Sequence, residues 1–230
     1  MPAHAPTSPL DLLAQLTPSE VALAFADRFL PATSEKQPWG YLVMTSGRYV
    51  NSPNLAAFMA EVVVGALVER GDAALLERPT RFLLWSRSRP ALQLSAAAAS
   101  GNRWPVDSPE GRVLEWLRAQ RDDAAHLLRD VLAEGLIGDP NDAAHRAPLD
   151  VGLRGMARLH LTAVAHRSTM RIVRYDEVTI DQARVAVLSR ASDADVTECL
   201  AGHRALSANE RARIRRAWTS AAALKCPHGY

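Results

Sequence analysis

The sequence predicts a mainly α protein, a compact helical domain that carries one or two small β-hairpins. Helix-start patterns recur along the chain, and apolar residues follow them at helical spacing. Short apolar runs bounded by turn residues are few. The 230 residues are 48% hydrophobic and 23% charged, which is typical of a globular chain that can bury a core without disulfides or a metal.

The first firm helix signal is the capping box Thr17-Pro18-Ser19-Glu20, with Pro18 at the first helical position. We therefore expect residues 1–16 to form a flexible N-terminal arm, 17–224 a single helical domain and 225–230 a flexible C-terminal tail. Residues 39–45 predict a strand, and a turn at Ser46-Gly47 lets residues 48–50 pair back on it as a short hairpin.

A second helix is expected to begin with Ser52 as its cap and to end at Gly71, with a broad apolar face between them. Two short strands, 74–77 and 81–85, are predicted around a turn at Pro79. The run Ala96–Ala99 is compatible with a short helix or a linker.

The second half of the chain predicts more helices. They are expected to begin at Ser108, at about Asp122, at Asp150, at 181 and at 194. A separate last helix, opened by Ser207–Glu210, is expected to run from Arg211 to Leu224. The Asp122 helix would end near 135–138, and the Asp150 helix would continue to Val164. Thr179–Gln182 and Ser207–Glu210 form further capping-box patterns.

Composition limits the classes of function. The formal charge of +2 is too small for a bulk-basic nucleic-acid binder. Cys199 and Cys226 have no metal-type spacing, and Cys226 with His228 supplies too few ligands for a closed metal site. The longest apolar run, 55–68, contains Glu61 and is too short to span a bilayer. These features predict a cytoplasmic protein without a signal peptide, a transmembrane segment, a metal or a cofactor.

Motifs of known catalytic chemistry are missing from the sequence, and its seven histidines are scattered. We therefore expect no enzymatic activity. The last helix is rich in arginine, and Arg211 and Arg215 share one face of it. That face is either a solvated helix surface or a basic surface for anions. Trp39 and Trp104 lie beside Pro or Gly, where partial exposure is expected.

Two segments carry a family resemblance. The first, 49–71, is a helix that ends in Arg70-Gly71 before a hairpin. The second combines 115–117, 127–137 and 147–150, in which a helix ends in Gly135 and a Pro-Leu segment opens the next helix. In this order and spacing, over about residues 17–220, the chain resembles the Golgi phosphoprotein 3 family, including its bacterial members.

The resemblance implies a compact helical fold that binds membranes peripherally through phosphatidylinositol 4-phosphate, without catalysis. The family's headgroup pocket uses a Trp and an Arg near the first matched helix and two Arg on the later one. Arg121 matches one of these positions, and Arg48 and Trp39 lie close enough in sequence to fill others. The family's apolar hairpin has no counterpart in residues 138–146, which are short, polar and interrupted by Pro140.

Three functions remain open. The first is binding of anionic lipid headgroups through Arg121, Arg48 and Trp39, with Arg211 and Arg215 as a secondary basic surface. The second is a protein–protein interaction module that keeps the fold and has lost the lipid site. The third, less expected, is nucleic-acid binding by a winged-helix-like unit at 52–85, whose wing region carries four arginines: Arg78, Arg81, Arg87 and Arg89.

Overall fold

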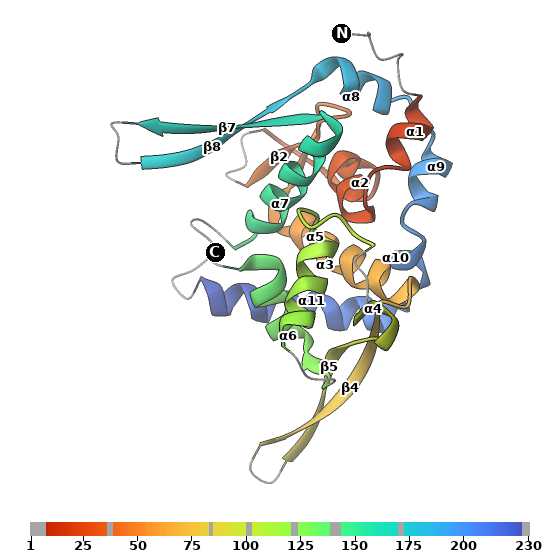
Figure 1. Cartoon of the computed structure of the whole chain (residues 1–230), viewed down its shortest axis with the longest axis vertical. Helices are drawn as coiled ribbons and strands as arrows, with labels where there is room; N and C mark the ends of the chain where they lie inside the picture. The colour runs from red at the N-terminus through yellow and green to blue at the C-terminus, as the bar shows by residue number, and fades with distance from the viewer. Residues whose placement is uncertain are drawn as a thin grey trace.

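The computed structural model of the chain is 57% helical and 18% strand, which confirms the mainly α prediction. It describes residues 8–35, 39–82, 85–99, 103–120, 124–138, 144–169 and 173–226. Figure 1 shows a helical body from which two long hairpins project.

The helices follow one another along the whole described chain. The α-helices are α1 (Pro9–Leu13), α2 (Pro18–Ala24), α3 (Ser52–Glu69), α4 (Ala96–Ala99), α5 (Pro109–Ala119), α6 (Leu128–Val131), α7 (Ala147–Gly155), α8 (Gln182–Leu188), α9 (Asp193–Glu198), α10 (Ala201–Ala205) and α11 (Ala208–Lys225). The other helical segments are the 3₁₀ turns η1 (Ala26–Arg28) and η3 (Met156–Leu159) and the π-helix η2 (Leu132–Ile137).

The strands form three small antiparallel sheets. They are β1 (Ala32–Thr33), β2 (Gly40–Leu42), β3 (Tyr49–Asn51), β4 (Ala73–Phe82), β5 (Trp85–Leu94), β6 (His126–Leu127), β7 (Thr162–Thr169) and β8 (Val173–Ile180). Their orders are β1-β3-β2, β4-β5-β6 and β7-β8. The small hairpin predicted from 39–50 is confirmed as β2–β3.

Helix α3 lies between two hydrophobic cores. The upper core in Figure 1 joins its first half to α1, α2, β3, α7, α8 and α9. The lower core joins it to α5, α6, η2, α11 and the base of β4–β5. Within the described residues, α3 alone is long and apolar enough to cross a membrane, but 72% of that stretch is buried inside the protein. Its sequence therefore suits the core helix of this fold.

The ends of α3 follow local chemistry. Its N-cap is Asn51, whose side chain accepts the Asn54 N–H at 3.0 Å, so the predicted cap at Ser52 is displaced by one residue. Both residue types cap helices well, and the sequence does not decide between them. The C-terminal prediction is confirmed, because Gly71 adopts φ +69°, a conformation that glycine accepts without steric cost.

The turn predicted at Pro79 is wrong. Strand β4 continues through Pro79 and pairs with β5 from Ala73↔Leu94 to Phe82↔Trp85. Pro79 pairs with Ser88, and Pro90 pairs with Glu77, two residue pairs further along the same two strands. Both prolines can therefore lie in pairs that exchange no hydrogen bond, where a missing N–H costs little.

The predictions for residues 150–182 are also partly wrong. Helix α7 begins at Ala147 rather than Asp150, and the chain becomes strand β7 at Thr162, short of the predicted helix end. Strand β8 then occupies Val173–Ile180, so the helix that follows is capped by Asp181 and not by Thr179. The Asp181 side chain accepts the N–H groups of Ala183 and Arg184.

Two further expectations differ from the structure. The long helix predicted from Asp122 is divided into β6, α6 and the π-helix η2, because His126 and Leu127 pair with β5. Part of the predicted flexible arm is the short helix α1, whose Leu12 and Leu13 are buried in the upper core. The capping boxes at Thr17 and Ser207 and the helix start at Ser108 are confirmed.

Candidate functional site: an arginine-lined groove

The residues expected to bind a headgroup are not brought together. Trp39 precedes β2 and Arg48 precedes β3, at opposite ends of the β2–β3 ladder. Trp39 is 38% exposed, and its ring packs perpendicular to that of His145, with centroids 4.8 Å apart. Arg121 lies outside the described residues. Trp39 and Arg48, the two of these three residues that the structure describes, therefore lie at separate places and do not form one site.

The surroundings of Arg48 do not favour an anion. Arg48 lines a pocket together with Arg28, Asp27 and Asp193, so two arginines face two carboxylates. An anionic headgroup would be repelled there about as strongly as it would be attracted.

The described ring neighbour of Trp39 is His145. Burial and the neighbouring Arg146 both lower the pKa of His145, which keeps its ring uncharged at neutral pH. Neither of its ring nitrogens has a hydrogen-bond partner within the described chain. Trp104, expected to be partly exposed like Trp39, is instead buried and donates a hydrogen bond to Asp72 at 2.7 Å.

Arg211 and Arg215 make internal contacts. Arg211 donates to the carbonyl oxygen of Leu206 at 3.0 Å and so closes the turn before α11. Arg215 donates to Glu61, a fully buried carboxylate of α3 that also contacts His203 Nε2 at 3.0 Å. Arg215 thus joins α11 to α3.

The other arginines of α11 face a groove. Arg213 and Arg216, three residues apart and hence on one helix face, line a groove of about 620 Å³ between α11 and the β4–β5 hairpin. Arg87 and Arg89 of β5 enter it from the hairpin, and Arg129 enters it from α6. We call these five residues the arginine groove: Arg87, Arg89, Arg129, Arg213 and Arg216.

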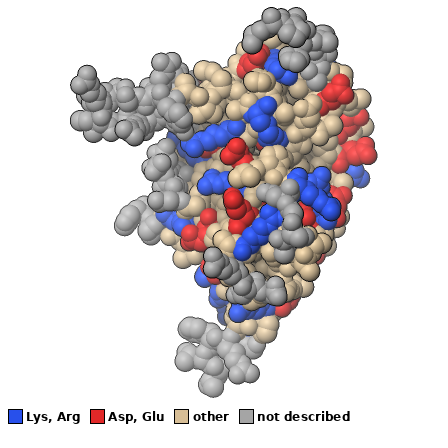
Figure 2. Space-filling model, in the orientation of Figure 1, with Lys and Arg blue, Asp and Glu red and all other residues tan. Residues whose placement is uncertain are grey.

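Secondary-structure periodicity explains the convergence. Arg87 and Arg89 are two apart on a strand and therefore share one face of the hairpin. The α11 helix lies across the base of this hairpin because Ile214, Ala217 and Trp218 are buried in the lower core. Burial of that apolar face turns Arg213 and Arg216 toward the hairpin. Figure 2 shows basic side chains near the lower end of the molecule, beside the hairpin.

Among the lining residues of the groove, Glu77 is the one carboxylate. It accepts a hydrogen bond from Arg213 and another from the Ser88 hydroxyl at 2.5 Å. Arg129 pairs with Asp130 at 2.9 Å. No hydrogen bond or ion pair to a described residue holds the guanidinium groups of Arg87, Arg89 or Arg216, so three cations are available to an anionic ligand.

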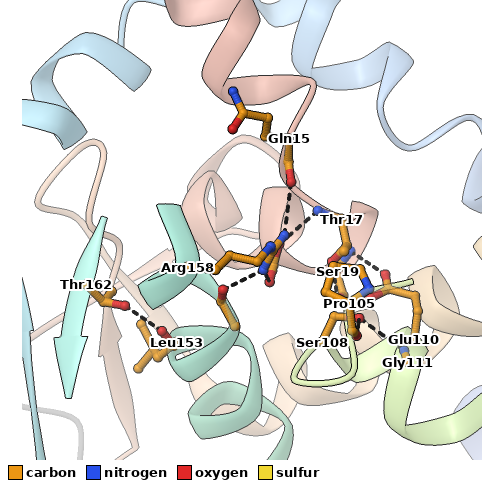
Figure 3. A network of polar contacts seen from close by, with 12 residues as sticks. Gln15, Thr17, Ser19, Pro105, Ser108, Glu110, Gly111, Leu153, Arg158 and Thr162 are labelled. Carbon is orange, nitrogen blue, oxygen red and sulfur yellow. Dashed lines mark hydrogen bonds and ion pairs between the residues drawn. The ribbon is translucent and has the colours of Figure 1, made fainter. Parts of the chain in front are cut away.

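A second polar cluster is buried and saturated (Figure 3). The carboxylate of Glu20 accepts hydrogen bonds from the Thr17 amide and from Arg158, which also donates to the Gln15 carbonyl at 2.9 Å. The carboxylate of Glu110 accepts from the amide and hydroxyl of Ser19 at 2.8 and 2.7 Å. Both carboxylates are fully buried, so the cluster ties chain segments together and offers no acid or base to a substrate.

Other reactive groups in the described chain are also poorly placed for chemistry. Burial and the nearby Glu198 and Asp195 raise the pKa of Cys199, which disfavours its nucleophilic thiolate form. Within residues 8–35, 39–82, 85–99, 103–120, 124–138, 144–169 and 173–226, no three His, Cys, Asp or Glu side chains cluster as a metal site would require.

The sequence shows all five arginines but not their convergence, since they come from three segments far apart in the chain. The usable signals are local: Arg at i and i+2 of a strand, and at i and i+3 of a helix. Comparison of the chain with protein-family models, with curated proteins and with solved structures gives no significant match. The arginine groove therefore rests on its own geometry.

Proposed function

We propose that the protein binds anionic membrane surfaces peripherally, without catalysis, by accepting phosphate-bearing lipid headgroups into the arginine groove. The observation that carries this proposal is the convergence of five arginines on one groove of about 620 Å³. Guanidinium groups form bidentate, charge-assisted hydrogen bonds with phosphate oxygens, so this lining suits a phosphomonoester.

The hairpin beside the groove supports a membrane as the source of the phosphate. Strands β4 and β5 project from the body (Figure 1), and their last pair is Phe82↔Trp85. In the sequence, Phe82, Leu83, Leu84 and Trp85 form an apolar run between Arg81 and Arg87. An apolar run flanked by arginines is the composition of a segment that meets the interface of an anionic bilayer.

A winged-helix mode of nucleic-acid binding is less well supported. A hairpin does follow α3, as the wing of that motif would. However, a recognition helix must be exposed to enter a groove of DNA, and most of α3 is buried. Of the four arginines of the wing region, Arg78 donates its hydrogen bond to the carbonyl of Ala125 at 2.7 Å. Arg87 and Arg89 line the groove beside α11.

We propose further that the chain is a divergent relative of the Golgi phosphoprotein 3 family, whose lipid is phosphatidylinositol 4-phosphate. The mainly α architecture and the helix-then-hairpin unit at α3–β4–β5 support this relationship. In this proposal the arginine groove takes the headgroup, and Arg48 and Trp39 have lost that role.

Vesicle co-sedimentation tests the proposal directly. The protein is mixed with neutral vesicles, with phosphatidylserine vesicles and with phosphatidylinositol 4-phosphate vesicles matched in net charge to the second set. We expect sedimentation with both anionic sets, stronger with the phosphomonoester and reduced by salt. Background sedimentation with all three at low salt would exclude lipid binding. Preference for a polynucleotide added as competitor would instead favour nucleic acid.

A further inference from the structure

A second pocket, of about 560 Å³, lies between η1, the β2–β3 turn and α9, in the upper half of the molecule. Its charged lining is balanced, with Asp27 and Asp193 facing Arg28 and Arg48. A ligand with charge of only one sign gains little binding free energy in such a pocket, because attraction and repulsion offset each other. A ligand that carries both signs can pair each of them.

One pair of the lining charges is already engaged. Arg28 Nη1 lies 2.7 Å from Asp193 Oδ1, and Arg28 Nη2 donates to the Ala191 carbonyl at 3.1 Å. The same guanidinium group stacks on the Phe25 ring, 4.5 Å from its centroid. This ion pair lines the pocket and joins η1 to α9.

The other two charges are unpartnered. Asp27 Oδ1 is buried and accepts no hydrogen bond from the described protein, a condition that is unfavourable for a polar atom. Arg48 is exposed, and its guanidinium makes no hydrogen bond or ion pair with a described residue. Its hydrogen bonds are made by the backbone, whose N–H donates to Ser46 Oγ at 3.2 Å and whose carbonyl accepts from the Val43 N–H at 2.8 Å. Asp27 thus lacks a donor, and Arg48 lacks an acceptor.

From this arrangement we infer that the pocket binds a small zwitterion of the α-amino acid class. Its ammonium group donates to Asp27, and its carboxylate accepts from Arg48 and from the hydroxyl of Ser46. The Phe29 ring, packed 5.5 Å from Phe58, lines the pocket and gives the ligand side chain an apolar surface. This site is separate from the arginine groove, because the two share no lining residue.

Thermal unfolding in the presence of single amino acids, followed by calorimetric titration of those that raise Tm, tests this inference. A ligand that binds only the folded state raises Tm in proportion to its occupancy. We expect a subset of amino acids to stabilise the protein. The N-acetyl derivative, which lacks the ammonium group, and the amino alcohol, which lacks the carboxylate, should each bind at least about tenfold more weakly, in line with the loss of one charge-assisted contact.

Two variants locate the site. Asp27→Asn and Arg48→Gln should each weaken binding by about tenfold or more, whereas Arg190→Gln, an exposed arginine outside the pocket, should leave it unchanged. Circular dichroism checks that every variant is folded. The inference is overturned if no amino acid raises Tm, if the N-acetyl derivative binds as tightly as its parent, or if both pocket variants bind like the wild type.

Discussion

Arg213 of α11 donates a hydrogen bond to Glu77 of β4, and this contact joins the last helix of the chain to the projecting hairpin. The hydroxyl of Ser88, on the neighbouring strand, donates to the other oxygen of the same carboxylate. Glu77 therefore fixes the walls of the arginine groove relative to each other, while it partly offsets the positive charge between them.

This double role makes Glu77→Gln informative. Glutamine keeps an acceptor for Arg213 but removes the one negative charge of the lining. We expect binding to anionic vesicles to strengthen by roughly fivefold, since one unit charge near a protein surface is worth about 1 kcal/mol or more. Stability should fall by less than about 1 kcal/mol, as for other partly exposed ion pairs.

Quantitative vesicle titration measures the change in affinity. Glu69→Gln, which removes an exposed carboxylate at the end of α3 and outside the groove lining, is the matched control and should have a smaller effect. Unchanged or weaker binding of Glu77→Gln would show that the charge of the groove does not govern association.

The buried cluster around Glu20 predicts a large effect on stability. Arg158→Ala removes the cation that neutralises this fully buried carboxylate. Removing one partner of such a pair costs about 3–5 kcal/mol, and we expect the lower value because Arg158 is partly exposed. Urea unfolding measures the loss. The double variant Glu20→Gln with Arg158→Met should recover part of it, and a single variant as stable as the wild type would refute this role.

The pH dependence of stability should change in Glu110→Gln. Burial raises the pKa of Glu110, and the nearby carboxylate of Glu20 raises it further. The hydrogen bonds from Ser19 lower this pKa but do not cancel the effect of burial. The folded state thus binds this proton more tightly than the unfolded state, so the contribution of Glu110 to stability is present below its unfolded pKa and is lost as pH rises through the folded pKa. Glutamine imitates the protonated acid at all pH values.

Relative to Glu110→Gln, the wild type should therefore lose unfolding free energy as pH rises above the ordinary range of a glutamate. Denaturant titrations of both proteins between acidic and neutral pH measure this difference. A difference that stays constant, or that grows in favour of the wild type as pH rises, would contradict the raised pKa.

Helix starts were predictable from the sequence because they depend on a few adjacent residues. Ser108 and Ser207 each accept an N–H of the first turn with their hydroxyls, and the N–H of Thr17 donates to the Glu20 carboxylate of its capping box. The β7–β8 hairpin was not predictable in the same way. Its residues carry no clear apolar alternation, and the ladder from Thr162↔Ile180 to Thr169↔Val173 depends on pairing between the two strands rather than on local preference.

The candidate site was predictable only in its parts. The sequence drew attention to the arginines of the last helix and of the hairpin, but it selected Arg211 and Arg215 of that helix as a secondary basic surface. In the structure, Arg211 is hydrogen-bonded to the Leu206 carbonyl and Arg215 to the Glu61 carboxylate. Which arginines remain available depends on the direction in which α11 buries its apolar face, and that direction is set by tertiary packing against α3 and η2.

The most direct test of the central claim compares two double variants in vesicle co-sedimentation. Arg87→Ala with Arg216→Ala removes two unpaired cations of the groove, and Arg190→Ala with Arg204→Ala removes two exposed arginines elsewhere at equal net charge. We predict that the groove variant loses binding to phosphatidylinositol 4-phosphate vesicles by about a hundredfold, about tenfold per lost contact, while the control binds nearly like the wild type. Equal binding by the two folded variants would contradict the account.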